Sequence, residues 1–300
     1  MIRPGGRTRI FTRRRRRGGW LLAAALVSAV AAAAALATAR VLGDEEPRAG
    51  DPGPVHVHAL GVNPADGSLF IATHTGLFRL DRDAGRAERV GDRYQDTMGF
   101  TVAGPDHFLG SGHPDIRDEL PPLLGLIESR DAGKTWTPIS LLGEVDFHAL
   151  RVRGRLLVGY DATGARVMTS NDRGRSWRSA RPPEPLVDLA VAPHSARRLL
   201  AAGESALFSS PDDGRTWKRV EEGTGLLAWP RADRLYLLDG GGQVWLSRDG
   251  GRRWQNRGRI GGRPAALLAT GSENLFAATH AGEIRQSNDG GVSWTTRSRQ

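Results

Sequence analysis

The sequence predicts an all-β protein, a six-bladed β-propeller with four-stranded blades, preceded by an N-terminal transmembrane or signal helix. Three observations support this fold class. One octapeptide returns at a nearly constant spacing, and short β-rich runs separated by turn residues fill each interval. An uncharged stretch before the first interval is long enough to form a membrane helix.

The repeated octapeptide has the form S-x-D-x-G-x-x-W. Good copies begin at residues 129, 170, 210, 247 and 287, so the spacings are 41, 40, 37 and 40 residues. A degenerate copy at residues 81–88 lies 48 residues before the first good one and completes a set of six. A period near forty is typical of propeller blades.

Each octapeptide is predicted to form a hairpin turn. The Asp accepts backbone N–H bonds across the turn, the Gly adopts a positive φ, and the Trp opens the next strand with its indole between sheets. We therefore assign a structural role to the Asp and Trp of every good copy. These residues are Asp131, Trp136, Asp172, Trp177, Asp212, Trp217, Asp249, Trp254, Asp289 and Trp294.

The third repeat shows the strand pattern of one blade. Its runs DFHALRV, RLLVGYD, ARVMTSND and SWRSA are β-rich and separated by turn residues. Six such blades form one closed domain over residues 55–298, and radial closure protects the sheet edges. Cysteine is absent, so this fold depends on its core without disulfides, and cysteine-ligated zinc is excluded.

The basic charge of the chain is concentrated at its N-terminus. The formal net charge is +9, but eight arginines precede residue 18, and without them the charge falls to about +1. The remainder lacks the basic face of a nucleic-acid-binding domain, so we expect no nucleic acid partner. Residues 1–19 are predicted to be a cytoplasmic basic tail.

Residues 20–39 are an uncharged stretch of twenty residues, which is enough to span a membrane as a helix. Two interpretations remain open. An uncleaved signal anchor would leave a single-pass protein in the cell membrane, with the propeller outside the cytoplasm. Alternatively, the stretch is a signal peptide cleaved near Ala39, and the protein is secreted. Residues 40–54, charged and rich in Pro and Gly, are predicted to be a linker to the propeller.

Histidines concentrate on one predicted face of the propeller. Strand direction alternates within a blade, so the starts of the inner strands and the ends of the second strands share a face, opposite the octapeptides. Six of the eight histidines map there, in blades 6, 1, 2 and 3, which are contiguous once the ring closes: His56, His58, His74, His113, His148 and His280. Asp96 and Asp146 align with His56, and Met98 aligns with His58.

Imidazole and carboxylate groups that converge at a propeller mouth can hold Zn, Cu or Fe, and Met98 could add a soft ligand for copper. Two alternatives stay open. The histidines could bond to neighbouring backbone and simply close the channel, or they could act directly in acid–base catalysis. The predicted metal ligands are His56, His58, His74, His113, His148, Asp96 and Asp146.

A loop at residues 113–122 explains the 48-residue interval and is predicted on the histidine-bearing face. Long loops on such a face often carry recognition residues, although a solvated proline-rich loop is an equally good interpretation. The predicted ligand-binding residues are Asp115 and Arg117 in this loop, together with Asp161 and His280 at the ends of second strands.

The octapeptide resembles the Asp-box or BNR repeat of sialidases, sortilin-type propellers and the photosystem II stability factor. The segments HVHALGVNP, ATHTGLF, DTMGF and GSGHP further resemble a bacterial group of exported BNR-repeat proteins that are usually labelled glycosyl hydrolases. The resemblance covers most of residues 55–298. It implies a propeller and leaves two activities open: a binding or scaffold protein for a protein, glycan or metal ligand, and a glycoside hydrolase.

A glycosidase needs two carboxylic acids, or in sialidases a tyrosine nucleophile with a carboxylate partner. The chain lacks the Arg-Ile-Pro motif of sialidases ahead of its first octapeptide, and its three tyrosines show no matching context. Sialidase activity is therefore not expected. Candidate acids for another glycosidase remain, and they are Asp96, Asp146, Asp118 and Glu119.

Overall fold

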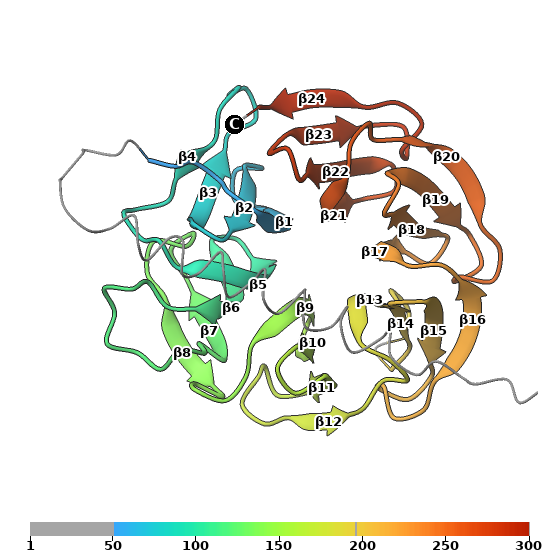
Figure 1. Cartoon of the computed structure of the whole chain (residues 1–300), viewed down its shortest axis with the longest axis horizontal. Coiled ribbons are helices and arrows are strands. Elements are labelled where there is room, and N and C mark those ends of the chain that lie inside the picture. Colours follow the sequence, from blue (N-terminus) through green and yellow to red (C-terminus); the bar gives the residue numbers. More distant parts are fainter. Residues whose placement is uncertain (1–50, 196, 300) are drawn as a thin grey trace, which may run out of the picture. The chain divides into compact units, whose positions relative to one another are not determined.

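The computed structural model describes residues 51–195 and 197–299, and these residues form a ring of six antiparallel four-stranded sheets (Figure 1). Each sheet consists of four strands that follow one another in the sequence, with the first strand innermost. The all-β six-bladed propeller predicted from the sequence is confirmed.

The strands of blades 1 and 2 are β1 (Val57–Val62), β2 (Leu69–Thr73), β3 (Gly76–Leu80), β4 (Glu88–Arg89), β5 (Asp96–Gly104), β6 (His107–His113), β7 (Leu126–Ser129) and β8 (Thr137–Ser140). Blades 3 and 4 contain β9 (Phe147–Arg153), β10 (Leu156–Asp161), β11 (Arg166–Ser170), β12 (Arg178–Ala180), β13 (Leu186–Val191), β14 (Leu199–Gly203), β15 (Ala206–Ser210) and β16 (Lys218–Glu222). Blades 5 and 6 contain β17 (Gly225–Arg231), β18 (Arg234–Asp239), β19 (Gln243–Ser247), β20 (Gln255–Arg259), β21 (Pro264–Thr270), β22 (Asn274–Thr279), β23 (Ile284–Ser287) and β24 (Thr295–Ser298).

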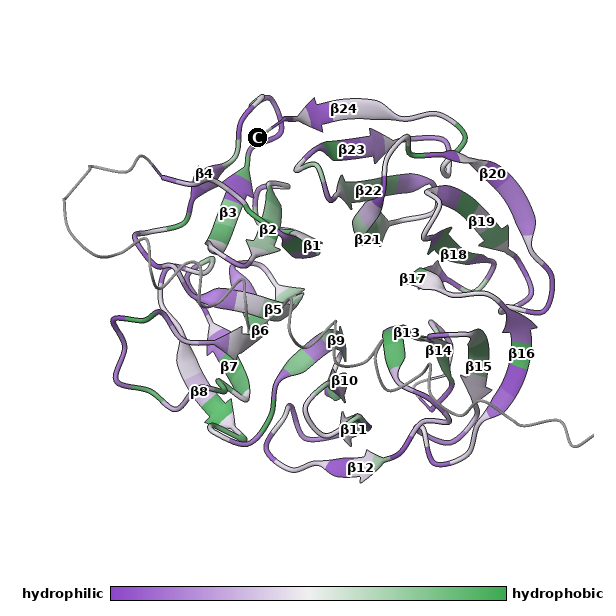
Figure 2. Ribbon diagram, in the orientation of Figure 1, coloured by the Kyte–Doolittle hydropathy of each residue, from purple (hydrophilic) through white to green (hydrophobic). Residues whose placement is uncertain are grey.

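The hydrophobic core lies between neighbouring blades. Each apolar cluster combines side chains from two consecutive sheets, and one cluster joins blade 6 to blade 1 through Phe276, Ile284, Ile71 and Phe78. Figure 2 shows the same division along each blade, because hydrophobic residues fill the inner strands while the outermost strands are largely hydrophilic. The burial of apolar area between sheets therefore closes the ring, without an exchanged strand.

The octapeptide turns connect the third strand of a blade to the fourth. In the turn of blade 5, the buried Ser247 hydroxyl donates to Asp249 Oδ1 (2.9 Å) and accepts the Gly251 N–H (2.8 Å). Asp249 Oδ1 also accepts the Arg253 N–H at 2.9 Å. The equivalent bonds recur in the turns that begin at residues 129, 170, 210 and 287.

Glycine is required in these turns for two reasons. Gly174 has a φ of +83°, and a Cβ on it would stand 2.2 Å from Leu126 Cδ2 of the preceding blade.

The degenerate copy at residues 81–88 has neither the buried serine nor the tryptophan, and the outer strand of its blade, β4, is only two residues long.

Asp188 ties three blades together near the inner strands. Its carboxylate accepts the Leu227 N–H of blade 5 at 2.8 Å and pairs with Arg151 of blade 3 at 2.5 Å. It also accepts the N–H of its neighbour Leu189 at 2.7 Å. The side chain is only 7% exposed, so these donors supply the hydrogen bonds that the carboxylate loses when it is removed from water.

No helix that is long and apolar enough to cross a membrane occurs among residues 51–195 and 197–299. The predicted anchor or signal peptide at residues 20–39, the basic tail and most of the linker lie outside these described residues. Membrane attachment therefore stays a prediction.

We predict that Ser247→Ala lowers the free energy of unfolding by about 1–3 kcal/mol, because it leaves the buried Gly251 N–H without an acceptor. Urea denaturation followed by tryptophan fluorescence measures this loss. Arg248→Ala, at the exposed next position, is the matched control and should change stability by less than about 0.5 kcal/mol. Equal losses in the two variants would contradict a bracing role for the serine.

We also predict that stability falls as the pH drops below about 4, the ordinary range of an aspartate. The Ser176 hydroxyl and N–H and the Ser170 hydroxyl hold the pKa of Asp172 well below that range, and the Ser293 hydroxyl does the same for Asp289. A pKa that is lower in the folded state contributes stability above the unfolded value, and this contribution is lost as the carboxylate becomes protonated.

The control for this pH dependence lies in the degenerate copy. Asp172→Asn should flatten the decrease in unfolding free energy between pH 5 and pH 3, as measured by urea denaturation at each pH. Asp83 occupies the same position of the degenerate copy and, within the described part of the chain, accepts none of these hydrogen bonds. Asp83→Asn is therefore the matched comparison, and a slope that Asp172→Asn flattens no more than Asp83→Asn does would refute the assignment.

Candidate functional site

The ends of the strands create a face that we call the histidine face, defined by His56, His58, His74, His113, His148 and His280. The inner strands begin on this face, the second strands end on it, and the octapeptide turns lie on the opposite face. A channel of about 270 Å³ opens among the inner strands of all six blades, and His58, His148 and Val187 belong to its lining.

A β-bulge at the start of the inner strand affects where several of these side chains point. The register between first and second strands shifts at His58 in blade 1 and at His148 in blade 3. Equivalent shifts occur at Met98–Gly99, Val187 and Ala265 in blades 2, 4 and 6. The bulged residue is unpaired in its ladder, and bulges of this kind re-aim side chains next to functional sites.

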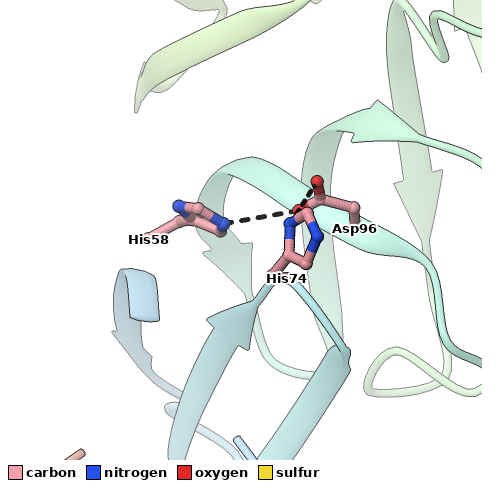
Figure 3. Close-up of side chains that lie close together, drawn as sticks. All are labelled: His58, His74 and Asp96. Atoms are coloured by element: carbon pink, nitrogen blue, oxygen red, sulfur yellow. Dashed lines mark ion pairs between the residues drawn. The ribbon is translucent and has the colours of Figure 1, made fainter. Parts of the chain in front are cut away.

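The first cluster on this face consists of His58, His74 and Asp96 (Figure 3). Asp96 is the first residue of β5 in blade 2, whereas the two histidines belong to blade 1. His74 Nδ1 lies 2.8 Å from Asp96 Oδ2, and His58 Nε2 lies 3.3 Å from Asp96 Oδ1. His56 is adjacent, with its ring centroid 6.1 Å from that of His74.

The second cluster, one blade further round the ring, consists of His113, His148 and Asp146. His148 Nε2 lies 2.8 Å from Asp146 Oδ2, and His113 Nε2 lies 3.6 Å from the same oxygen. His113 Nδ1 is 2.8 Å from the Pro122 carbonyl oxygen. A carbonyl can only accept, so Nδ1 carries a proton and donates it to this oxygen, while Nε2 faces the cluster.

The two clusters follow a common plan. The residue at the end of a second strand meets the residue at the start of the next blade's inner strand, as in His74 with Asp96 and His113 with Asp146. The same plan brings His280 of blade 6 near His56 of blade 1. Burial lowers the pKa of His280, and the positive charges of Arg263 and His56 lower it further.

The predicted ligand-binding residues of the blade 2 loop bond to one another. Asp115 is 1% exposed and accepts the Tyr94 N–H at 2.8 Å, the Arg117 N–H at 3.0 Å and the Arg117 guanidinium at 2.6 Å. These contacts give Asp115 and Arg117 a role in holding the base of the loop.

The other predicted polar residues are placed separately. Asp118 pairs with Arg93, and Glu119 is exposed on the same loop. Asp161 is buried, and its Oδ2 accepts Arg166 Nε at 2.8 Å. The structure therefore brings together His58, His74 and Asp96, and His113, His148 and Asp146, but leaves Asp118, Glu119 and Asp161 outside both clusters.

Sequence reasoning missed the apolar residues of the histidine face. Six large apolar side chains are exposed among the described residues, and five of them lie on this face: Val55, Tyr94, Ile116, Leu120 and Val187. The sixth, Val292, lies in an octapeptide turn on the opposite face. Ile116, 94% exposed between Asp115 and Arg117, was the available signal, because an isoleucine in a charged loop has no core to enter.

Comparisons with known proteins agree on the fold. No protein-family model matches the sequence, and no curated protein is significantly similar to it. Solved structures match with low sequence identity, which shows the fold alone. The chain resembles the structure described as "YCF48 bound to D1 peptide" with a TM-score of 0.53 and 16% identity, over 82% of this chain and 83% of that one.

Two further solved structures with the same fold are a chain of a protein complex and an enzyme. A chain of the nidogen/laminin complex gives a TM-score of 0.59 and 15% identity, over 77% of this chain and 95% of that one. The GH74 enzyme of Niastella koreensis gives a TM-score of 0.58 and 14% identity, over 81% of this chain. The match covers 45% of the enzyme, so the chain spans less than half its length.

Proposed function

We propose that this chain is an exported binding propeller of the Asp-box type that captures a segment of another protein on its histidine face. The observation that carries the proposal is the distribution of exposed apolar side chains, five of six on that face. Exposed apolar residues that gather on one face among polar groups are typical of protein interfaces. Exposed apolar residues without a binding role are usually spread singly over the whole surface.

Tyr94 provides a preorganised contact at this face. Its side chain lies beside two guanidinium groups, with Arg89 Cζ 3.9 Å and Arg117 Cζ 5.7 Å from the ring centroid. Arg89 is in turn paired with Asp51, and Arg117 with Asp115. An aromatic ring held by cation–π contacts loses little entropy on binding, and such residues are frequent energetic centres of interfaces.

Two of the similar propellers support a protein ligand. YCF48 is described bound to the D1 peptide, and the other matched chain belongs to a complex of nidogen with laminin. These are properties of those proteins, and they favour the same kind of ligand for this chain. The octapeptide turns, with their repeated Ser–Asp–Gly bonds, support the assignment to the Asp-box type.

Export and membrane attachment complete the proposal. Residues 20–39 are long and uncharged enough to span the membrane, and the arginines of residues 1–19 favour the cytoplasmic side for the N-terminus. The propeller would then face outward, tethered near its binding partners. Cleavage near Ala39 would instead release it.

Glycoside hydrolysis is the weaker proposal, although the GH74 enzymes share the fold. Three of the four candidate acids face basic partners, because Asp96 and Asp146 face imidazoles and Asp118 faces Arg93. A glycosidase requires two carboxyl groups opposed across one substrate bond. The histidine–carboxylate pairs favour ligand binding over this arrangement.

We predict that a peptide ligand binds through the apolar residues of the histidine face. A phage-displayed random-peptide library would be panned on the purified full-length chain, and the dissociation constant of an enriched peptide would be measured by fluorescence anisotropy. Ile116→Asp and Tyr94→Ala should weaken binding about tenfold or more, since truncation of a residue at the energetic centre of an interface costs about 2 kcal/mol or more. Val292→Asp should change it less than about twofold.

The control separates the two faces, because Val292 is also apolar and 52% exposed but belongs to an octapeptide turn. Peptides that bind equally well to all three variants, or that depend on Val292, would refute the proposal. Turnover on a glycoside panel that is lost in Asp96→Asn or Asp146→Asn would establish the hydrolase instead.

A further inference from the structure

We infer that His58, His74 and Asp96 form a binding site for a divalent first-row transition metal ion, with Zn²⁺ as the best match. The inference rests on the proposed function in that the ion belongs to the ligand-binding face. Among residues 51–195 and 197–299, this cluster alone offers three histidine or carboxylate donor atoms within 4.8 Å of one another.

One pair of donors already has the spacing that a small tetrahedral ion requires. Bonds of about 2.0–2.2 Å to zinc place tetrahedral ligand atoms roughly 3.3–3.5 Å apart. His58 Nε2 and Asp96 Oδ1 are separated by 3.3 Å, and His74 Nδ1 and Asp96 Oδ2 by 2.8 Å. The 2.8 Å contact has the length of a hydrogen bond, which a bound ion would replace, and Figure 3 shows the three side chains converging.

A second, independent observation concerns unsatisfied polar atoms. His58 Nε2 and Asp96 Oδ1 are both buried, and neither has a hydrogen-bond partner with acceptable geometry although they face each other. A buried polar atom left without a partner costs about 1–3 kcal/mol. An ion bound between these two atoms would satisfy both at once.

The backbone around the cluster is shaped to present its ligands. His58 occupies the β-bulge at the start of β1, and His56 has a φ of +53° in the left-handed region. Such features are costly or locally disruptive, and they concentrate at functional sites. The two histidines come from blade 1 and Asp96 comes from blade 2, so the cluster forms only where these two sheets meet.

The donor set selects the class of ion. Two imidazole nitrogens and one carboxylate oxygen suit Zn²⁺ and neighbouring divalent ions, whereas Mg²⁺ and Ca²⁺ prefer oxygen ligands. Three protein ligands leave a coordination position open. Because the His74 side chain is 61% exposed, that position is accessible to a donor atom from a bound partner or to the adjacent His56.

The second cluster provides the matched control. His113, His148 and Asp146 carry the same chemical groups on the same face, but His113 Nε2 is 3.6 Å from Asp146 and the three donors do not all converge within 4.8 Å. If chemistry alone determined binding, both clusters would take up metal. The inference predicts one tight site.

The test is metal binding by the purified full-length chain, kept soluble in a mild detergent and carrying no histidine tag. Zn²⁺ would be titrated by isothermal calorimetry, and Co²⁺ by visible absorption, whose intensity reports a tetrahedral environment. We expect one equivalent of Zn²⁺ per chain. His74→Ala and Asp96→Asn should weaken binding about 100-fold or more, because changes at outer-shell partners alone cost roughly 10–100-fold.

Two controls keep this test interpretable. His74 is largely exposed, so His74→Ala should retain the thermal unfolding midpoint of the parent and show that lost metal binding is not lost folding. His113→Ala should leave the affinity for the first equivalent of Zn²⁺ within about threefold. Absence of stoichiometric binding in the parent chain, or equal loss in His113→Ala and His74→Ala, would overturn the inference.

The metal site and the peptide-binding function fail separately. Tight Zn²⁺ binding without any peptide dependence on Ile116 or Tyr94 would retain the metal site and refute the proposed function. Peptide binding that depends on those residues, in a chain that takes up no Zn²⁺ or Co²⁺, would support the proposed function and refute the metal site.

Discussion

Apolar packing between consecutive blades is the interaction on which the rest of this structure depends. Each sheet is made from consecutive strands, and the chain contains no cysteine, so neither an exchanged strand nor a disulfide secures the ring. Blade 6 meets blade 1 through buried side chains such as Ile284 and Ile71. Only when this contact forms do His280 and His56, at opposite ends of the domain sequence, come close to each other.

The blade architecture divides structural and functional demands between two faces. On one face, the Ser–Asp–Gly turns fix the third and fourth strands with buried hydroxyls and positive-φ glycines, which leaves little freedom for other chemistry. On the other face, the strand ends are held by their ladders while their side chains remain free to vary. A rigid scaffold that presents variable ends is the usual basis of recognition.

The sequence was sufficient for the fold because the octapeptide period, the turn glycines and the strand runs are local signals that agree with one another. It was also sufficient to align His74 with His113 and Asp96 with Asp146. The pairing of His74 with Asp96 depends on contact between blades, which no local pattern encodes. The bulge at His58 has no sequence signature, and the Asp115–Arg117 pair shows that a charged loop residue can serve its own loop.

The comparison of the two clusters shows why convergence matters more than residue type. Asp96 and Asp146 occupy the same register, as do His74 and His113, so a rotation by one blade superimposes two of the three positions. The third position differs. His58 comes from the blade before that of Asp96, whereas His148 comes from the same blade as Asp146. In blade 2, the position equivalent to His148 is occupied by Met98. The first arrangement places the carboxylate against two histidines of the preceding blade. The second holds His148 and Asp146 two positions apart in one chain segment, with His113 Nδ1 bonded to the Pro122 carbonyl. Identical chemical groups thus produce three converging donor atoms in one position and, in the next, a hydrogen-bonded His–Asp pair with a more distant second histidine.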